Sequence, residues 1–123
     1  MGDQEVAARR IFIAEDNALV MMSLEGLVED MGWELVGPAE TLEQANKFAD
    51  ECEADVALLD VNLNGERSFP AAERLAERGV PVVFATGYDR ELDLPAALAD
   101  AKIVQKPFRL ESLEETLKEL TGD

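Results

Sequence analysis

The sequence predicts an α/β fold in which a five-stranded parallel sheet has helices on both faces. Short apolar runs bounded by polar residues are typical of buried parallel strands, and here they alternate with segments whose apolar residues recur at helical spacing. Five such repeats fit into 123 residues, which is a common size for one domain. We therefore predict a single domain over residues 1–123, with its core at about residues 10–120.

The strands are predicted from five apolar runs, each bounded by polar or turn residues. Gly37-Pro38 is expected to stop the second strand, whereas Pro81 is tolerated because it opens the fourth. In chain order, the strands are expected at residues 11–14, 33–36, 55–59, 82–85 and 103–105.

The helices are predicted from apolar stripes and from residues that begin or end a helix. Gly32 and Gly79 are expected to end the first and third helices. Thr41, with Gln44 three residues later, is a capping box that begins the second. The expected apolar stripes are Val20, Leu24, Leu27, Val28 and Met31; Leu42, Ala45, Phe48, Ala49 and Cys52; Phe69, Ala72, Leu75 and Ala76; and Leu110, Leu113, Leu117 and Leu120.

Two connections are less regular. Residues 62–68 are expected to form a loop with turn chemistry at Asn64-Gly65. Residues 89–100 fit the helical period poorly and contain Pro95, so we expect a short or mobile helix there.

Composition excludes several classes of function. The 27 acidic and 11 basic residues give a net charge of -16, which opposes direct binding to nucleic acid or to an anionic membrane. The single Cys52 forms no internal disulfide, and no signal peptide or membrane span is evident, so we expect a cytoplasmic protein. The chain has no histidine, so a histidine phosphate carrier must come from a partner.

Charged residues follow three of the apolar runs. Glu15-Asp16, Asp60 and Lys106-Pro107 should meet at one edge, because the carboxyl ends of parallel strands share a crevice. Clustered carboxylates suit Mg²⁺, and Asp60 could attack a phosphoryl group as a nucleophile. Lys106 would offer a positive charge to the phosphoryl oxygens, and Thr86 would donate a hydroxyl to them after phosphorylation.

These residues resemble the receiver domain of two-component response regulators over essentially the whole chain. The resemblance implies that Asp60 is the phosphoacceptor and that Asp16 binds magnesium directly. It also implies that Glu15 binds the metal mainly through water, and that the backbone carbonyl of Asn62 is a further ligand. Lys106 would contact the phosphoryl group, with a cis bond to Pro107, and the sheet order would be 2-1-3-4-5.

The expected switch departs from the usual receiver pattern. Ile103 stands where receivers carry an aromatic residue that moves when the threonine, here Thr86, engages the phosphoryl group. The run Phe84-Ala85-Thr86-Gly87-Tyr88 instead resembles a subgroup of mostly stand-alone receivers with a Phe-Ala-Thr-Gly-aromatic motif. We expect Tyr88 and the segment after it to order around Thr86 on phosphorylation.

The expected function is a single-domain response regulator. A histidine kinase or histidine phosphotransfer protein would phosphorylate Asp60, and the product would act as a signalling switch or as a phosphate sink and feedback regulator. No DNA-binding output domain is expected, because the chain stops directly after the last helix, and we expect a monomer or weak dimer. We expect that the protein is not an enzyme acting on an external substrate, and that it hydrolyses only its own acyl phosphate.

Other classes fit the sequence less well. An aspartyl-phosphate phosphatase of the dehalogenase type would need a general acid where the chain has Asn62. A flavodoxin would need a phosphate loop where Glu15-Asp16 would repel a flavin phosphate. A receiver that only binds proteins would be expected to lack part of the site, and here all of it is present.

Overall fold

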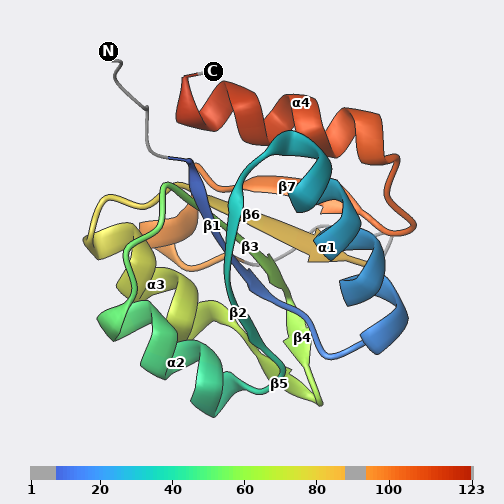
Figure 1. The fold of residues 1–123 in the computed structure, drawn as a ribbon. Coiled ribbons are helices and arrows are strands. Elements are labelled where there is room, and N and C mark those ends of the chain that lie inside the picture. The colour runs from blue at the N-terminus through green and yellow to red at the C-terminus, as the bar shows by residue number, and fades with distance from the viewer. Residues whose placement is uncertain (1–7, 88–93, 123) are drawn as a thin grey trace.

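The computed structural model describes residues 8–87 and 94–122, which contain the predicted parallel sheet (Figure 1). Its five strands have the order β2-β1-β3-β6-β7, and every neighbouring pair is parallel. Because β4 and β5 lie outside this sheet, the order is the expected 2-1-3-4-5 when the main strands are counted along the chain. The strands are β1 (Arg10–Ala14), β2 (Glu34–Ala39), β3 (Val56–Asp60), β6 (Val82–Thr86) and β7 (Lys102–Gln105).

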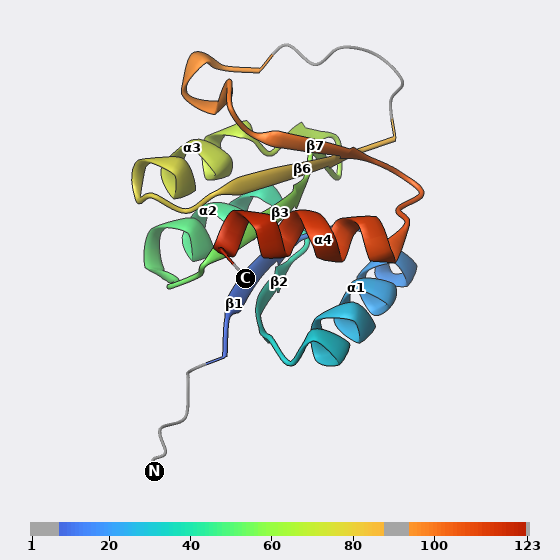
Figure 2. The same cartoon turned by 90° about the horizontal axis from the view of Figure 1, so that it is seen from above.

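Helices cover both faces of the sheet (Figure 2). The first face carries α1 (Ala18–Met31) and α4 (Leu110–Thr121), and the second carries α2 (Leu42–Glu51) and α3 (Phe69–Glu77). Alternation along β1 explains the two cores, since Ile11 and Ile13 pack towards α1 and α4 while Phe12 packs towards α2 and α3. Among the described residues, none of the helices has the length and apolar character needed to span a membrane.

The predicted helix ends are largely confirmed. Gly32 follows α1 in the left-handed region at φ 73°. The Thr41 hydroxyl accepts a hydrogen bond from the Gln44 N–H at 3.2 Å, so Thr41 is the cap of α2. The capping box is incomplete, because the Gln44 side chain accepts from the N–H of Glu40 at 2.7 Å rather than from that of Thr41.

The predicted end of the second strand was wrong. β2 continues through Gly37-Pro38 to Ala39, whose carbonyl accepts from the Glu15 N–H at 2.9 Å. Gly37 permits this at φ 102°, in a place where a Cβ would lie 3.2 Å from the Ile13 carbonyl oxygen. Pro38 is tolerated because β2 is an edge strand, which can dispense with one N–H on its outer side.

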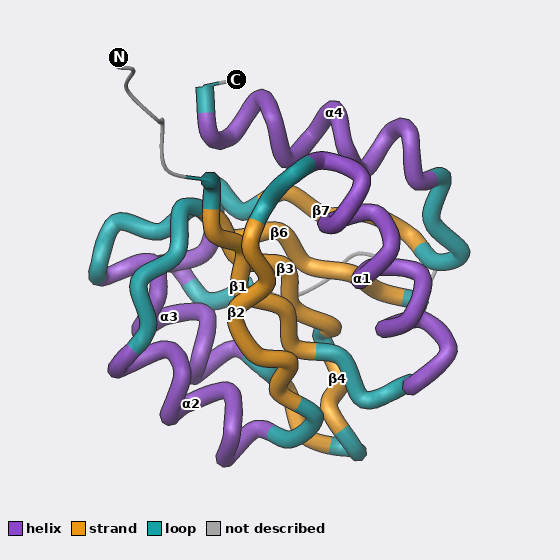
Figure 3. The backbone as a smooth tube through the Cα atoms, in the orientation of Figure 1, coloured by secondary structure: helices purple, strands orange, loops and turns teal. Residues whose placement is uncertain are grey.

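The expected loop at residues 62–68 contains a small hairpin (Figure 3). β4 (Asn62–Leu63) and β5 (Glu66–Arg67) pair antiparallel across the predicted Asn64-Gly65 turn. Asn64 has φ 51° and Gly65 has φ 91°, which are the signs that a two-residue type I′ turn requires.

The segment at residues 89–100 was predicted to hold a short or mobile helix. Residues 88–93 lie outside the described part of the chain, so this prediction is tested only from residue 94 onwards. There the chain forms the short 3-10 helix η1 (Ala96–Leu98), in which Leu98 is buried against the second face of the sheet.

Candidate functional site

The predicted strand ends meet at one edge of the sheet. Glu15 follows β1, Asp60 ends β3 and Lys106 follows β7. The Lys106 Nζ lies 2.8 Å from Glu15 Oε1 and 2.7 Å from Asp60 Oδ2, so one ammonium bridges two buried carboxylates. The peptide bond from Lys106 to Pro107 is cis, as the resemblance implied.

Asp16 completes a cluster of three carboxylates. One oxygen from each of Glu15, Asp16 and Asp60 lies within 4.8 Å of the others. Glu15 and Asp60 are buried, whereas Asp16 is exposed. The sequence prediction that these three side chains converge with Lys106 is therefore confirmed in position.

Each of these carboxylates accepts a hydrogen bond from a backbone N–H. Glu15 Oε2 accepts from Asn17 at 3.0 Å, and Asp60 Oδ1 accepts from Asn62 at 3.1 Å. Asp16 Oδ2 accepts from Asn64 at 2.8 Å, across 48 positions of the chain. The first two donors follow their acceptor by two residues, whereas the third is brought to the site by the hairpin.

Burial and hydrogen bonding together shift the pKa values of Glu15 and Lys106. Burial raises the pKa of Glu15, and the nearby charge of Asp60 adds to that effect, while the hydrogen bonds from Lys106 and Asn17 oppose it. Burial alone would lower the pKa of Lys106, but its hydrogen bonds to Asp60 and Glu15 outweigh burial and raise it. Lys106 is therefore a permanent cation at neutral pH, held between two acids.

The donor set fits a hard divalent cation. Mg²⁺ prefers carboxylate, carbonyl and water oxygens, and it is usually held by only one or two carboxylates together with waters. Glu15, Asp16 and Asp60 supply such oxygens within a small space, and the exposure of Asp16 leaves water access to one side of the cluster. Three mutually repelling acids with a single bridging ammonium also leave negative charge that a cation would neutralise.

The three predicted switch residues have different outcomes. Thr86 ends β6 and is buried at 2% exposure, and its carbonyl accepts from the Lys106 N–H at 2.8 Å, so it lies beside the charged cluster. Ile103 lies on β7 with 45% of its surface exposed. Tyr88 lies outside the described residues.

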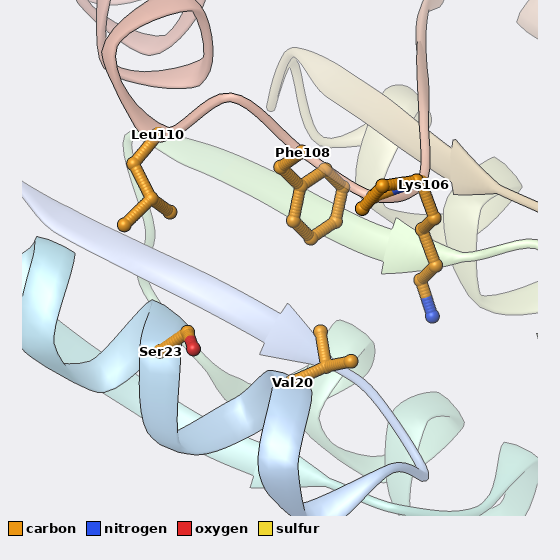
Figure 4. A pocket seen from close by; sticks show the side chains of 6 residues that line it. Val20, Ser23, Lys106, Phe108 and Leu110 are labelled. Atoms are coloured by element: carbon orange, nitrogen blue, oxygen red, sulfur yellow. The ribbon is translucent and has the colours of Figure 1, made fainter.

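A groove lies beside the charged site (Figure 4). It has a volume of about 450 Å³ and is mostly apolar. Phe108 and Leu110 line one side, Val20 and Ser23 of α1 line the other, and Lys106 lies at one end. Leu110 was expected in the apolar stripe of α4, but it is 40% exposed here because it lies at this groove, whereas Leu113 and Leu117 are buried.

Two features of this region were missed by the sequence analysis. The Asn64 N–H was not assigned to the site, although Asn-Gly is a strong hairpin signal and could have suggested that a turn returns to this edge. The groove residues Phe108 and Leu110 carry no motif, so only the packing of α4 against α1 identifies them.

The chain belongs to the response regulator receiver domain family, whose model matches residues 11–118. The fold and the charged cluster therefore define a phosphoacceptor signalling domain of two-component systems. This match confirms the prediction, made from the charged strand ends, that the chain is a response regulator receiver domain.

Particular relatives refine this picture. The transcriptional regulatory protein PdtaR of Mycobacterium tuberculosis is 31% identical over 109 residues, which are 85% of this chain and 53% of PdtaR. The phyllosphere-induced regulator PhyR of Methylorubrum extorquens is 34% identical over 105 residues, which are 83% of this chain and 39% of PhyR. This chain thus spans about half the length of PdtaR and less of PhyR.

A solved structure matches over nearly its full length. The solution structure of SdrG from Sphingomonas melonis Fr1 is 37% identical, with a TM-score of 0.78, and the match covers 94% of this chain and 98% of that chain. The architecture of this chain is therefore shared with a solved protein of closely similar extent.

Proposed function

We propose that this chain is a single-domain response regulator that accepts a phosphoryl group on Asp60 in a magnesium-dependent reaction. The observation that carries the proposal is the Lys106 ammonium, 2.7 Å from Asp60 Oδ2 and 2.8 Å from Glu15 Oε1, at the edge where the acidic strand ends meet. This arrangement combines a carboxylate nucleophile with a fixed cation, which aspartyl phosphate formation requires.

Asp60 is the nucleophile of the proposed transfer. One of its oxygens forms a bond to phosphorus while the bond from phosphorus to the imidazole nitrogen of a partner histidine breaks, and the bonding electron pair passes to that nitrogen. Asn62 N–H orients the Asp60 carboxylate through Oδ1, and Lys106 neutralises charge that gathers on the phosphoryl oxygens. Thr86, at the adjacent end of β6, donates its hydroxyl to the phosphorylated product.

Magnesium would be held by Glu15, Asp16, Asp60 and the backbone carbonyl of Asn62. When bound, it would screen the repulsion between the carboxylates and the incoming phosphoryl group. Glu15 would act mainly through water, because it is buried and already paired with Lys106.

The phosphoryl donor would be a histidine kinase or histidine phosphotransfer protein that docks at the groove between α1 and the segment Pro107–Leu110. This groove ends at Lys106, so a partner seated in it would reach Asp60. Leu19 and Met22 on α1 are 75% and 64% exposed and extend the apolar surface available to it. The net charge of -16 favours a donor whose surface around the histidine is basic.

The fate of the phosphoryl group decides the biological role. The chain would turn over no external substrate and would hydrolyse its own acyl phosphate. Rapid hydrolysis would suit a phosphate sink or feedback regulator of the kinase, and slow hydrolysis would suit a switch that contacts another protein. SdrG and PhyR are relatives of this chain, and we also propose that it belongs to the Phe-Ala-Thr-Gly-aromatic subgroup, on the run from Phe84 to Tyr88.

Intact-mass measurement tests this function. The protein is incubated with Mg²⁺ and acetyl phosphate, with and without excess EDTA, and the mass is followed over time. We expect one added phosphoryl group that requires magnesium and is absent in Asp60→Asn. The adduct should persist in the control variant Asp100→Asn, because Asp100 is an exposed aspartate that lies just before β7. An adduct retained in Asp60→Asn would refute the assignment, and decay of the wild-type adduct distinguishes a sink from a longer-lived signal.

A further inference from the structure

The β4–β5 hairpin contacts the acidic cluster directly. The turn residue Asn64 donates its N–H to Asp16 Oδ2 at 2.8 Å, and its side-chain Nδ2 donates to the Glu40 carbonyl at 3.3 Å. Figures 1 and 3 show the hairpin beyond the end of β3, at the same edge of the sheet as the connection from β1 to α1. The turn therefore joins the metal-binding edge to the connection between β2 and α2.

The conformation of the turn is fixed by its own residues. Asn64 and Gly65 both have positive φ, at 51° and 91°. Asn62 Oδ1 accepts from the Gly65 N–H at 2.7 Å, and the Ser68 N–H donates to the Val61 carbonyl at 2.9 Å at the base of the hairpin. The direction of the Asn64 N–H thus follows from the Asn-Gly turn and from the Asn62 side chain.

Asp16 differs from the other two carboxylates in needing this support. Glu15 and Asp60 are buried and share the Lys106 ammonium, so packing and charge fix their positions. Asp16 is exposed, and its Oδ2 accepts a hydrogen bond from the Asn64 N–H. A freely rotating Asp16 would have to lose side-chain entropy each time it bound a cation.

We propose that the Asn64-Gly65 turn is a positioning element for the metal site, holding Asp16 Oδ2 so that this carboxylate stays within reach of Glu15 and Asp60. The inference rests on the proposed function, in which this cluster binds Mg²⁺. A carboxylate has two oxygens, so Asp16 can keep the Asn64 N–H on one and offer the other to the cation. Partners of this kind typically change metal affinity by about 10-fold to 100-fold when they are lost.

A pair of glycine variants isolates the turn from general strain. Gly65→Val places a β-branched residue at φ 91°. Gly79→Val does the same at φ 82°, in the connection from α3 to β6, at the opposite end of the parallel strands from the acidic cluster. At both positions the space around an added Cβ is open, so backbone conformation is the feature that both substitutions disturb. Asn64→Gly is the complementary variant, because glycine keeps the positive φ and the N–H while losing the side chain.

Two measurements on the full chain decide the matter. Isothermal titration with MgCl₂ should show a dissociation constant at least about 10-fold higher in Gly65→Val, and values near wild type in Gly79→Val and Asn64→Gly. Without metal, amide exchange of Asn64 should be protected in wild type and faster in Asp16→Ala. Thermal melts establish that each variant is folded, and the two valine variants should lose similar stability.

The outcomes separate the two claims. Wild type that binds no Mg²⁺ would overturn the proposed function, and with it the role of the turn. Wild type that binds Mg²⁺ while Gly65→Val and Gly79→Val bind equally well would overturn the role of the turn alone. The role of the turn would also be overturned if the amide exchange rate of Asn64 were the same in wild type and in Asp16→Ala. In that case the hydrogen bond to Asp16 would not protect the Asn64 N–H and could not position the carboxylate.

Discussion

Replacing Lys106 by methionine tests whether its ammonium holds the two buried acids together. Lys106→Met keeps an apolar stem of similar length and removes the charge that lies 2.8 Å from Glu15 and 2.7 Å from Asp60. Removing one partner of a buried ion pair costs about 3–5 kcal/mol, because the remaining charge is left uncompensated. The Lys106 side chain is 21% exposed, which admits some water, so we expect a loss of about 3 kcal/mol at neutral pH.

The loss should depend on pH with a definite sign. Burial already raises the pKa of Glu15, and the Lys106 hydrogen bond opposes that rise, so the variant should raise this pKa further. A carboxyl group whose pKa is higher in the folded state binds more protons there than in the unfolded chain, so the free energy of unfolding falls as pH rises through that window. The deficit should therefore be smaller at about pH 5 than at about pH 7.

Urea unfolding followed by Trp33 fluorescence measures this deficit without magnesium. Lys102→Met, at the start of β7, is the matched control, because Lys102 is exposed and its loss should change the free energy of unfolding little. A deficit under about 1 kcal/mol, or one that is the same at both pH values, would refute the view that Lys106 compensates two buried carboxylates.

Three further substitutions test a helix cap, a buried hydroxyl and an exposed ion pair. Asn17→Ala should lower the free energy of unfolding by about 1 kcal/mol in a urea titration, because Asn17 Oδ1 caps α1 by accepting from two N–H groups. Its effect on Mg²⁺ affinity should be nil, since the backbone N–H to Glu15 is kept. Ser68→Ala should raise the free energy of unfolding by about 1 kcal/mol, because the buried hydroxyl has no partner among the described residues. Arg74→Ala should cost only about 0.5 kcal/mol, and less at high salt, because its 2.9 Å pair with Asp50 is exposed, and an equal loss in 1 M NaCl would contradict this.

The sheet could be predicted because its three central strands, β1, β3 and β6, are apolar and buried on both faces. In β3, every residue from Val56 to Asp60 is buried, and its apolar run stands out against polar neighbours. The end of β2 could not be predicted in this way, because Gly37-Pro38 ordinarily ends a strand. Its continuation depends on the Ala39 carbonyl pairing with the Glu15 N–H, which is a contact between distant residues.

The candidate site likewise contains some hydrogen bonds between neighbouring residues and one between residues far apart in sequence. Glu15 and Asp60 are each held by the amide two residues later, so their strand ends contain both the acid and its donor. Asp16 is held from 48 positions away, and nothing near it in sequence indicates this. A charge at a strand end is therefore visible in the sequence, whereas the hydrogen bond to the exposed carboxylate of Asp16 depends on the tertiary fold. This distinction predicts that lengthening the hairpin turn would break the hydrogen bond to Asp16 while Lys106 still bridges Glu15 and Asp60.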